Sequence, residues 1–457
     1  MNLSRQGKLL LSALILAGAA HAQSFESDTN IYGGGATSPA IAFIGVTYRD
    51  VTPPARLSTF SSNTAGTGFT QVQPSVPRRF GAPGGSIFLS YLLSNGSAAS
   101  YCQTGSGFGK SVLTAESNDL GHQRADDNCR DFSVSPIGLS APSGQDAPDF
   151  ISSSAPLTVS NYDSFEGNDG SFSRAASQGN LVQIPVLSQR IALPVNLPNT
   201  TTRQNLSVEE VCGIFSGEIT NWWEIGVTPD SQPINVVFRS DDSGTVFAFT
   251  QFLAANCNGM NGRDAAFFNT NELFSAALPN FPGYLYRSFS TGSGDNGVIN
   301  AVHQTPYSIG FANFSNVAVS NTDYALVNGR DPANSNNSVY YNYRDVLTDK
   351  LLGAPSSTTG LPETTNVGTV ARADPQGCVR LINPAAQLEG IYPIAAVTNI
   401  ETYTNNREPA AVRALIKQIL QTPASNLPPG YTQLGPDVRA ELIGTNGNGG
   451  TVARCIN

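Results

Sequence analysis

The run INVVF at residues 234–238 constrains the fold most, because such a run suits a strand that is buried on both faces. A turn at residues 239–245 follows it, and then a helical run that contains Phe247, Phe249 and Phe252. A strand covered on both faces needs helices packed around it. This order of strand, turn and helix therefore predicts an α/β architecture.

Other segments repeat the alternation of strands and helices. Residues 181–197 (LVQIPVLSQRIALPVNL) predict two consecutive buried strands. Ser207 and Glu210 form a capping box, which predicts a helix that begins at Ser207. A short apolar helix is also expected at 87–93, and an amphipathic helix at 408–420, where apolar residues share one side. In α/β folds of this kind, ligands bind at the carboxyl ends of the strands.

The first residues predict export. Arg5 and Lys8 precede an apolar run from Leu9 to Ala20, and residues 20–22 read as an A-x-A cleavage site. This pattern is typical of a secretory signal peptide at residues 1–22. The residue directly after the cleavage site is Gln23 and not a Cys, so a bacterial lipid anchor is not expected, and the mature protein should be periplasmic or secreted.

The mature chain would be large and acidic. Removing 22 of 457 residues leaves 435, which predicts two or three domains. Two of the 25 basic residues leave with the signal peptide, and 23 − 34 gives a formal charge of −11. This charge argues against nucleic acid as a partner, whereas a small anion can still be held by backbone N–H groups and one or two arginines. No later segment approaches the roughly 18 apolar residues of a spanning helix, so membrane insertion is not expected.

Cysteine usage fits an oxidising compartment. Six cysteines lie in the mature region, and they allow fifteen disulfide connectivities. We take nearest-neighbour pairing as the working expectation, which joins Cys102 to Cys129, Cys212 to Cys257 and Cys378 to Cys455. No CxxC motif or Cys/His cluster indicates zinc, so we expect no metal and no cofactor.

One segment, Phe238 to Phe247 (FRSDDSGTVF), carries the chemistry of an anion site. A strand delivers Arg239, and Ser243, Gly244 and Thr245 stand where a helix begins with free N–H groups. Glycine allows close approach of the backbone, and a guanidinium can donate two N–H groups to a tetrahedral oxyanion. The alternative interpretation is an ordinary capped helix with a surface arginine.

This segment resembles the signature of the periplasmic phosphate-binding proteins of ABC importers and of their secreted relatives, the DING proteins. The resemblance implies that Arg239, Ser243, Gly244 and Thr245 bind phosphate. It also implies that Asp241, two residues after the arginine, pairs with it. An ABC permease is the partner that the resemblance suggests, and we expect a monomer.

Further blocks resemble the same family in the same order. IYGGGATSPA from Ile31 resembles its opening glycine-rich loop, which implies ligand contacts at Thr37 and Ser38. TGSGFGKSVL from Thr104 resembles its second loop and implies a contact at Ser106. Framework segments resemble it at 208–225, 303–314 and 390–403, whereas insertions near 41–85 and 320–380 are not covered.

One position departs from the family pattern. Where the family has DFxASDAPL, this chain reads DFISSSAPL from Asp149, which places Ser154 at the position of an aspartate. A carboxylate accepts a hydrogen bond from protonated phosphate and repels sulfate, whereas a hydroxyl can donate or accept. We therefore expect a tetrahedral-oxyanion site with weakened discrimination, open to sulfate, arsenate, a phosphonate or a phosphoester. A shifted alignment would let Asp149 serve instead.

Three other interpretations remain open. Residues 104–111 resemble a Walker A loop, but Thr104 replaces the first glycine. A DING-like phosphatase that hydrolyses phosphomonoesters is the main alternative, although His122 and His303 are the only histidines of the mature chain and indicate no two-metal site. A secreted scavenger without a transporter is the third. Trp222 and Trp223 are interpreted as packing residues.

The resemblance implies two α/β lobes of the periplasmic-binding type, joined by two crossover strands that form the hinge. The first lobe is expected at 23–186 and 312–457, and the second at 187–311. Ligand would lie in the cleft between them, so the protein is interpreted as a binding protein that captures phosphate for uptake or scavenging.

Overall fold

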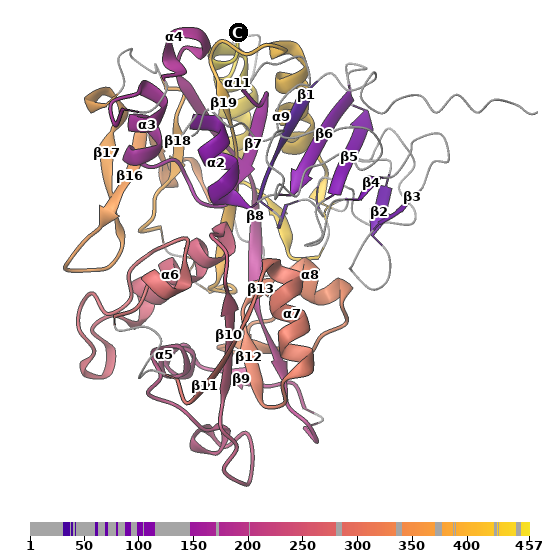
Figure 1. The fold of residues 1–457 in the computed structure, drawn as a ribbon, viewed down its shortest axis with the longest axis vertical. Helices are drawn as coiled ribbons and strands as arrows, with labels where there is room; N and C mark the ends of the chain where they lie inside the picture. Colours follow the sequence, from indigo (N-terminus) through magenta and orange to yellow (C-terminus); the bar gives the residue numbers. More distant parts are fainter. Residues whose placement is uncertain are drawn as a thin grey trace, which may run out of the picture.

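The computed structural model describes residues 31–36, 38–39, 42, 105–114, 147–170, 173–200, 202–279, 286–334, 341–370, 377–386, 388, 390–424, 427, 429–444 and 449–457, and the course of five strands between residues 60 and 103. These residues form two α/β lobes, one above the other (Figure 1). One long strand, β8 (Leu181–Asn196), runs through both lobes.

The first lobe is built on one end of the main sheet. Its strands follow the order β8-β19-β7-β1-β6-β5-β4, with β1, β6 and β7 mutually parallel. The bounds of the strands that join β8 here are Ile31–Gly35 (β1), Arg79–Phe80 (β4), Ile87–Leu92 (β5), Ala98–Gln103 (β6), Phe150–Ser153 (β7), Ala395–Tyr403 (β19) and Tyr431–Gln433 (β20). Helices cover this sheet at Ser106–Thr114 (α2), Val159–Glu166 (α3), Ala175–Gln178 (α4), Pro409–Gln421 (α9), Pro436–Ile443 (α10) and Thr451–Cys455 (α11).

The second lobe continues the same sheet in the order β11-β10-β12-β8, and β9, β13 and β14 lie beside this path. Its strands are Asn205–Leu206 (β9), Asn235–Arg239 (β10), Ser288–Gly292 (β11), Ser308–Gly310 (β12), Ala312–Asn313 (β13) and Tyr324–Val327 (β14). Its helices are Val208–Ser216 (α5), Gly244–Cys257 (α6), Gly294–Gln304 (α7) and Phe314–Val319 (α8), with single turns at Trp222–Ile225 (η1), Met260–Gly262 (η2) and Phe274–Ala276 (η3).

Three two-stranded sheets lie apart from the main sheet. They pair Phe60–Ser62 (β2) with Phe69–Gln71 (β3), Val346–Thr348 (β15) with Arg380–Ile382 (β18), and Lys350–Pro355 (β16) with Pro362–Asn366 (β17). Single turns lie at Tyr343–Asp345 (η5) and Val367–Thr369 (η6).

Strand β8 connects two separate hydrophobic cores. Its first half pairs with β19, and Val182 and Ile184 pack in the core under α9. Its second half pairs with β12, β13 and β14, and Leu193 packs in the core that contains α5 and α6. The return crossing lies just before β19, where Tyr392 packs in the second core and donates its hydroxyl to the carbonyl of Ile191 at 2.8 Å. The predicted two-lobed fold with crossover strands is confirmed.

Several local predictions can be compared with the structure. The capping box at Ser207 and the buried strand at 235–239 are present. The helix expected at 87–93 is wrong, because this run is strand β5, which pairs with β6. The two strands expected at 181–197 are one strand of 16 residues.

The predicted lobe limit at 311/312 falls between β12 and β13. Both strands pair with the second half of β8, and so does β14 at 324–325. This pairing favours a limit beyond residue 327. The limit at 186/187 stays a prediction.

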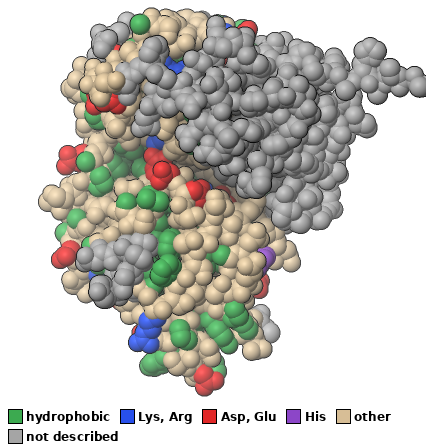
Figure 2. All heavy atoms as spheres, viewed as in Figure 1, with side chains coloured by type: hydrophobic (Ala, Val, Ile, Leu, Met, Phe, Trp, Pro, Cys, Tyr) green, Lys and Arg blue, Asp and Glu red, His purple; other side chains and the backbone are tan. Residues whose placement is uncertain are grey.

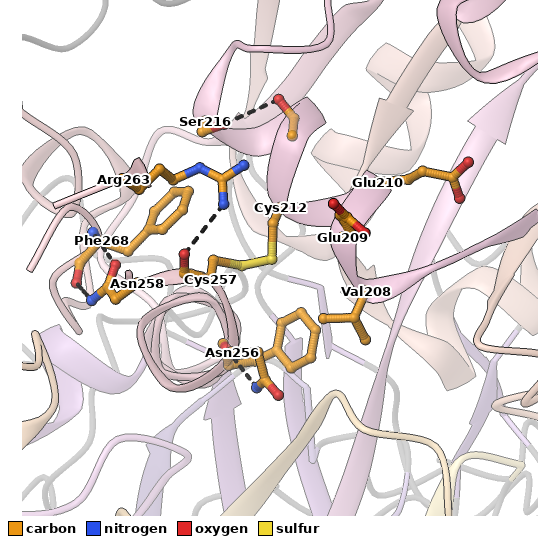
Figure 3. The surroundings of a disulfide bond; sticks show 12 residues. Val208, Glu209, Glu210, Cys212, Ser216, Asn256, Cys257, Asn258, Arg263 and Phe268 are labelled. Atoms are coloured by element: carbon orange, nitrogen blue, oxygen red, sulfur yellow. Dashed lines mark hydrogen bonds between the residues drawn. A yellow bond between two sulfur atoms is a disulfide. The ribbon is translucent and has the colours of Figure 1, made fainter. Parts of the chain in front are cut away.

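Two of the three expected disulfides are confirmed, Cys212–Cys257 and Cys378–Cys455. The first joins α5 to the last residue of α6 (Figure 3), and Arg263 donates to the Cys257 carbonyl at 3.2 Å beside it. The partner expected for Cys102 is Cys129, which lies outside the described residues. Within the described ranges, no helix is both long enough and apolar enough to cross a bilayer.

Candidate functional site

The carboxyl ends of strands from both lobes meet at one place. Ser38, Ser106 and Ser154 follow β1, β6 and β7 in the first lobe, and each is at most 3% exposed. In the second lobe, Ser243 follows β10 and Asp295 follows the parallel strand β11. Parallel strands place their carboxyl ends at one edge of a sheet, which is where α/β proteins bind ligands.

The two lobes touch at Gly244, the first residue of α6. A Cβ atom at this position would lie 2.4 Å from Cβ of Ser154 and 2.8 Å from Oγ of Ser106. Any larger side chain would therefore clash with the first lobe. Glycine allows the start of α6 to meet the serines directly, and the structure has its lobes closed at this point.

Arg239 is the cation of the site and is 2% exposed. Its Nε donates to Oδ1 of Asp241 at 2.8 Å, its Nη2 donates to Oδ2 of the same carboxylate, and its Nη1 donates to Oδ1 of Asp295 at 3.0 Å. A guanidinium has five N–H groups, so one on each terminal nitrogen is left for a ligand. Burial acts to raise the pKa of Asp241, but the hydrogen bonds and charge of Arg239 outweigh it and hold that pKa below its usual value. The pairing expected between Arg239 and Asp241 is present.

The start of α6 supplies a second source of positive potential. Ser243 caps this helix, since its Oγ accepts from the amide of Thr245 at 3.0 Å. The Ser243 amide donates to the carbonyl of Glu272 at 2.9 Å, which anchors the turn. The first amides of a helix have no partner within it, and the helix dipole favours an anion at this end.

A chain of hydrogen bonds links the serines of the first lobe to the second lobe. Gln189, in the middle of β8, donates from Nε2 to Oγ of Ser154 at 2.5 Å and to Oγ of Ser38 at 3.1 Å. Its Oε1 accepts from Nδ2 of Asn313 at 2.7 Å. The backbone amide of Asn313 in turn faces Asp295. No motif in the sequence indicates Gln189, Asn313 or Asp295 as site residues.

One ion pair crosses between the lobes. Lys110, on α2, is bound to the carboxylate of Glu272 and donates to the Pro156 carbonyl at 3.4 Å. The side chain of Lys110 is 3% exposed and that of Glu272 is 21% exposed. Figure 2 shows acidic and basic side chains close together at the waist between the lobes. The Walker-A-like segment thus provides Ser106 and this lysine at the closed interface.

Several candidate residues lie elsewhere. Asp149 precedes β7, at the opposite end of the strand from Ser154, and Arg407 binds both of its carboxylate oxygens at 2.6 and 3.1 Å. His303 lies at the end of α7, with Nε2 2.8 Å from the Thr322 hydroxyl. Trp222 is fully buried as expected, and Trp223 is 53% exposed. Thr37 and His122 lie outside the described residues, and the described ones contain no group of three or more His, Cys, Asp or Glu side chains that could hold a metal.

Fold and site together define a two-lobed α/β protein of the periplasmic-binding type, with a buried arginine facing a cluster of serines. The chain belongs to the PBP superfamily, because the model of the PBP superfamily domain matches residues 26–349, more than half of its length. The family and fold that the sequence motifs indicate are therefore confirmed.

Individual relatives agree with this assignment. Alkaline phosphatase L of Pseudomonas aeruginosa is 28% identical over 263 residues, which are 55% of this chain and 62% of the relative. A phosphate-binding protein from an unknown prokaryotic organism is 34% identical over 127 residues, 28% of this chain and 32% of the relative. The chain thus aligns with less than two thirds of either curated relative.

A solved structure extends the comparison to the whole fold. A high-affinity periplasmic phosphate-binding protein (PfluDING), bound with phosphate, matches with a TM-score of 0.57 at 19% identity. The match covers 94% of this chain and 99% of that protein. At this level of identity the match shows a shared fold.

Proposed function

We propose that this protein is an exported binding protein that captures phosphate, or a closely similar tetrahedral oxyanion, between its two lobes. The observation that carries the proposal is the contact of Gly244, at the start of α6 and five residues after Arg239, with Ser154 and Ser106 of the first lobe. Each of these groups offers N–H or O–H donors, and a desolvated anion needs such donors in place of water.

The names of the relatives support the same ligand. One curated relative and the matched structure are phosphate-binding proteins, and the structure holds phosphate. Another relative is named as an alkaline phosphatase, so hydrolysis of phosphomonoesters is the outcome against which binding must be tested.

Within this proposal, Arg239 supplies charge and two N–H groups, and Asp241 holds the guanidinium in place. Gly244 supplies a backbone amide at the start of α6, Thr245 contacts the ligand through its side chain, and Ser243 fixes that turn by accepting from the Thr245 amide. Hydroxyl groups from the first lobe, those of Thr37, Ser38, Ser106 and Ser154, complete the shell. A ligand that contacts both lobes favours the closed state by the difference in its affinity for the closed and open states.

Export and delivery are further parts of the proposal. The pattern at residues 1–22 supports cleavage of a signal peptide and release into the periplasm or beyond it. The periplasmic protein among the matched structures supports the same compartment. An ABC permease would receive the closed, loaded protein if it serves uptake.

Calorimetric titration of the purified mature protein with phosphate, sulfate, arsenate and a phosphomonoester tests the function. We expect phosphate to bind with one site per chain. A release assay on the phosphomonoester, with metal-stripped and metal-loaded protein, separates binder from enzyme. Turnover in either form, or the absence of any heat with all four anions, would overturn the proposal.

A further inference from the structure

Ser154 and Ser38 each accept a hydrogen bond from Gln189, and their Oγ atoms lie 3.5 Å apart, so one O–H group can be taken by the other hydroxyl and at least one is left for a ligand. Both N–H groups of the Gln189 amide point at these two hydroxyl oxygens, and Asn313 fixes the orientation of that amide by donating to its oxygen. A hydroxyl that accepts from Gln189 still has its own O–H to donate. This wall of the site therefore offers donors and no carboxylate.

A monoprotonated phosphate needs something that donors cannot give. It carries one O–H group, and in a buried site this group must find an acceptor or lose the hydrogen bond that it made to water. Sulfate has no such proton. A site built of donors alone would accept both anions, which is the weakened discrimination expected from Ser154.

Asp295 places a carboxylate in the same site from the second lobe. It is 0% exposed, and its Oδ1 accepts from Arg239 at 3.0 Å. The Thr245 hydroxyl and the Asn313 amide also face this carboxylate. Asp295 thus faces groups from three elements, β10, α6 and β13. Its Oδ2 is buried and has no hydrogen-bond partner within the described part of the chain.

We propose that Asp295 accepts the hydrogen bond from the proton that bound hydrogen phosphate carries, and so makes the site selective for a protonated tetrahedral oxyanion. The inference rests on the proposed function, because it assigns the carboxylate that such a site needs to the second lobe. Asp241 is less suited to this part, since Arg239 binds both of its oxygens and the Gly294 amide also donates to Oδ1 at 3.0 Å.

The protonation of Asp295 gives the selectivity a pH dependence. Burial raises the pKa of Asp295 above its usual value, although the charge of Arg239 acts in the opposite direction. Apart from Arg239 and Asp241, the elements packed against it carry few charges: β11, β12, β13 and α8 have none, and Arg190 on β8 donates to the Pro332 carbonyl. Once protonated, Asp295 can donate to sulfate instead of repelling it.

Sulfate competition against phosphate in calorimetry tests the inference. For the parent protein at neutral pH, we expect a hundredfold excess of sulfate to leave phosphate binding unchanged. We expect sulfate to bind directly as the pH is lowered. Asp295→Asn should bind phosphate roughly tenfold or more weakly, since a charged hydrogen bond is lost, and should bind sulfate at neutral pH without dependence on pH.

Asp241→Asn is the matched control, because it also removes a carboxylate from Arg239. It should weaken phosphate binding and leave sulfate excluded at neutral pH. Sulfate competition in the parent at neutral pH, or unchanged exclusion in Asp295→Asn, contradicts the inference while phosphate binding stands. Failure of phosphate to bind the parent instead overturns the proposed function. If Asp295→Asn does not fold, the pH titration of the parent with sulfate still tests the inference. Sulfate binding that does not increase as the pH falls contradicts it.

Discussion

Two buried cations lie at the closed interface, and they are built differently. Arg239 takes both of its carboxylate partners from its own lobe, Asp241 in the same turn and Asp295 on α7. Lys110 is in the first lobe and takes Glu272 from the second. The arginine cluster can therefore exist whether the lobes are open or closed, whereas the lysine pair exists only when they are closed.

This difference predicts a separate role for each of the two cations, Arg239 and Lys110. A preorganised arginine loses little freedom when an anion arrives, so its hydrogen bonds contribute directly to affinity. A pair that forms on closure must first lose water from both partners, and its net contribution is smaller. Arg239 is thus expected to determine binding, and Lys110 to adjust the balance between open and closed states.

The largest effect is expected from Arg239→Ala. It removes the charge and two N–H groups from a desolvated site, which should reduce phosphate affinity by about 2 to 5 kcal/mol in calorimetry. Arg203→Ala is the control, because Arg203 is half-exposed, pairs with Asp331 and is outside the proposed ligand shell. Equal affinity in the two variants would contradict the central part given to Arg239.

The next effect concerns Glu401, the buried carboxyl near Lys110. Burial raises its pKa to about 8, against 4.5 for the free side chain. The native state holds this proton where the unfolded chain has released it, so stability should fall as the pH rises from about 4.5 to about 8, by on the order of 1 kcal/mol per pH unit. Denaturant unfolding of the parent and of Glu401→Gln measures this slope. The same slope in both would show that Glu401 is not its cause.

Gly244→Ala tests the contact between the start of α6 and the serines of the first lobe. The added methyl group would overlap Ser154 and Ser106, so the lobes could not close fully. We expect phosphate affinity to fall by about 1 to 3 kcal/mol, with the stability of the free protein little changed. Gly368→Ala is the matched control, since a Cβ there meets no atom within 4 Å. Unaltered affinity in Gly244→Ala would mean that ligand binds without this contact.

The smallest effect is expected from Lys110→Met. Glu272 keeps access to water, so its loss of a partner should reduce phosphate affinity by only about 1 kcal/mol. Glu272→Gln should do the same, and the double variant should lose no more than either single one. Additive losses would show that the two residues act separately.

The sequence predicts those parts of the molecule that local chemistry determines. The capping box at Ser207 and the strand, turn and helix at 235–257 follow from short-range patterns and are present. The run at 87–93 could not be assigned in this way. A short apolar run suits a helix or a strand, and pairing with β6 decides the matter.

The candidate site shows the same limit. Ser38, Ser106 and Ser154 were named from motifs, and the structure brings them to Gly244 and Gln189. Gln189 lies inside an apolar strand, where a polar residue is the one available signal of a buried contact. Asp295 gave no local signal, because its importance depends on β11 being parallel to β10.

Equilibrium dialysis against labelled phosphate tests the central claim most directly. We predict that the mature protein retains one phosphate per chain at saturation and that Arg239→Ala, at the same concentrations, retains little or none. No retention by the parent, or equal retention by the parent and Arg239→Ala, would contradict the claim that the lobes close on an anion held by Arg239.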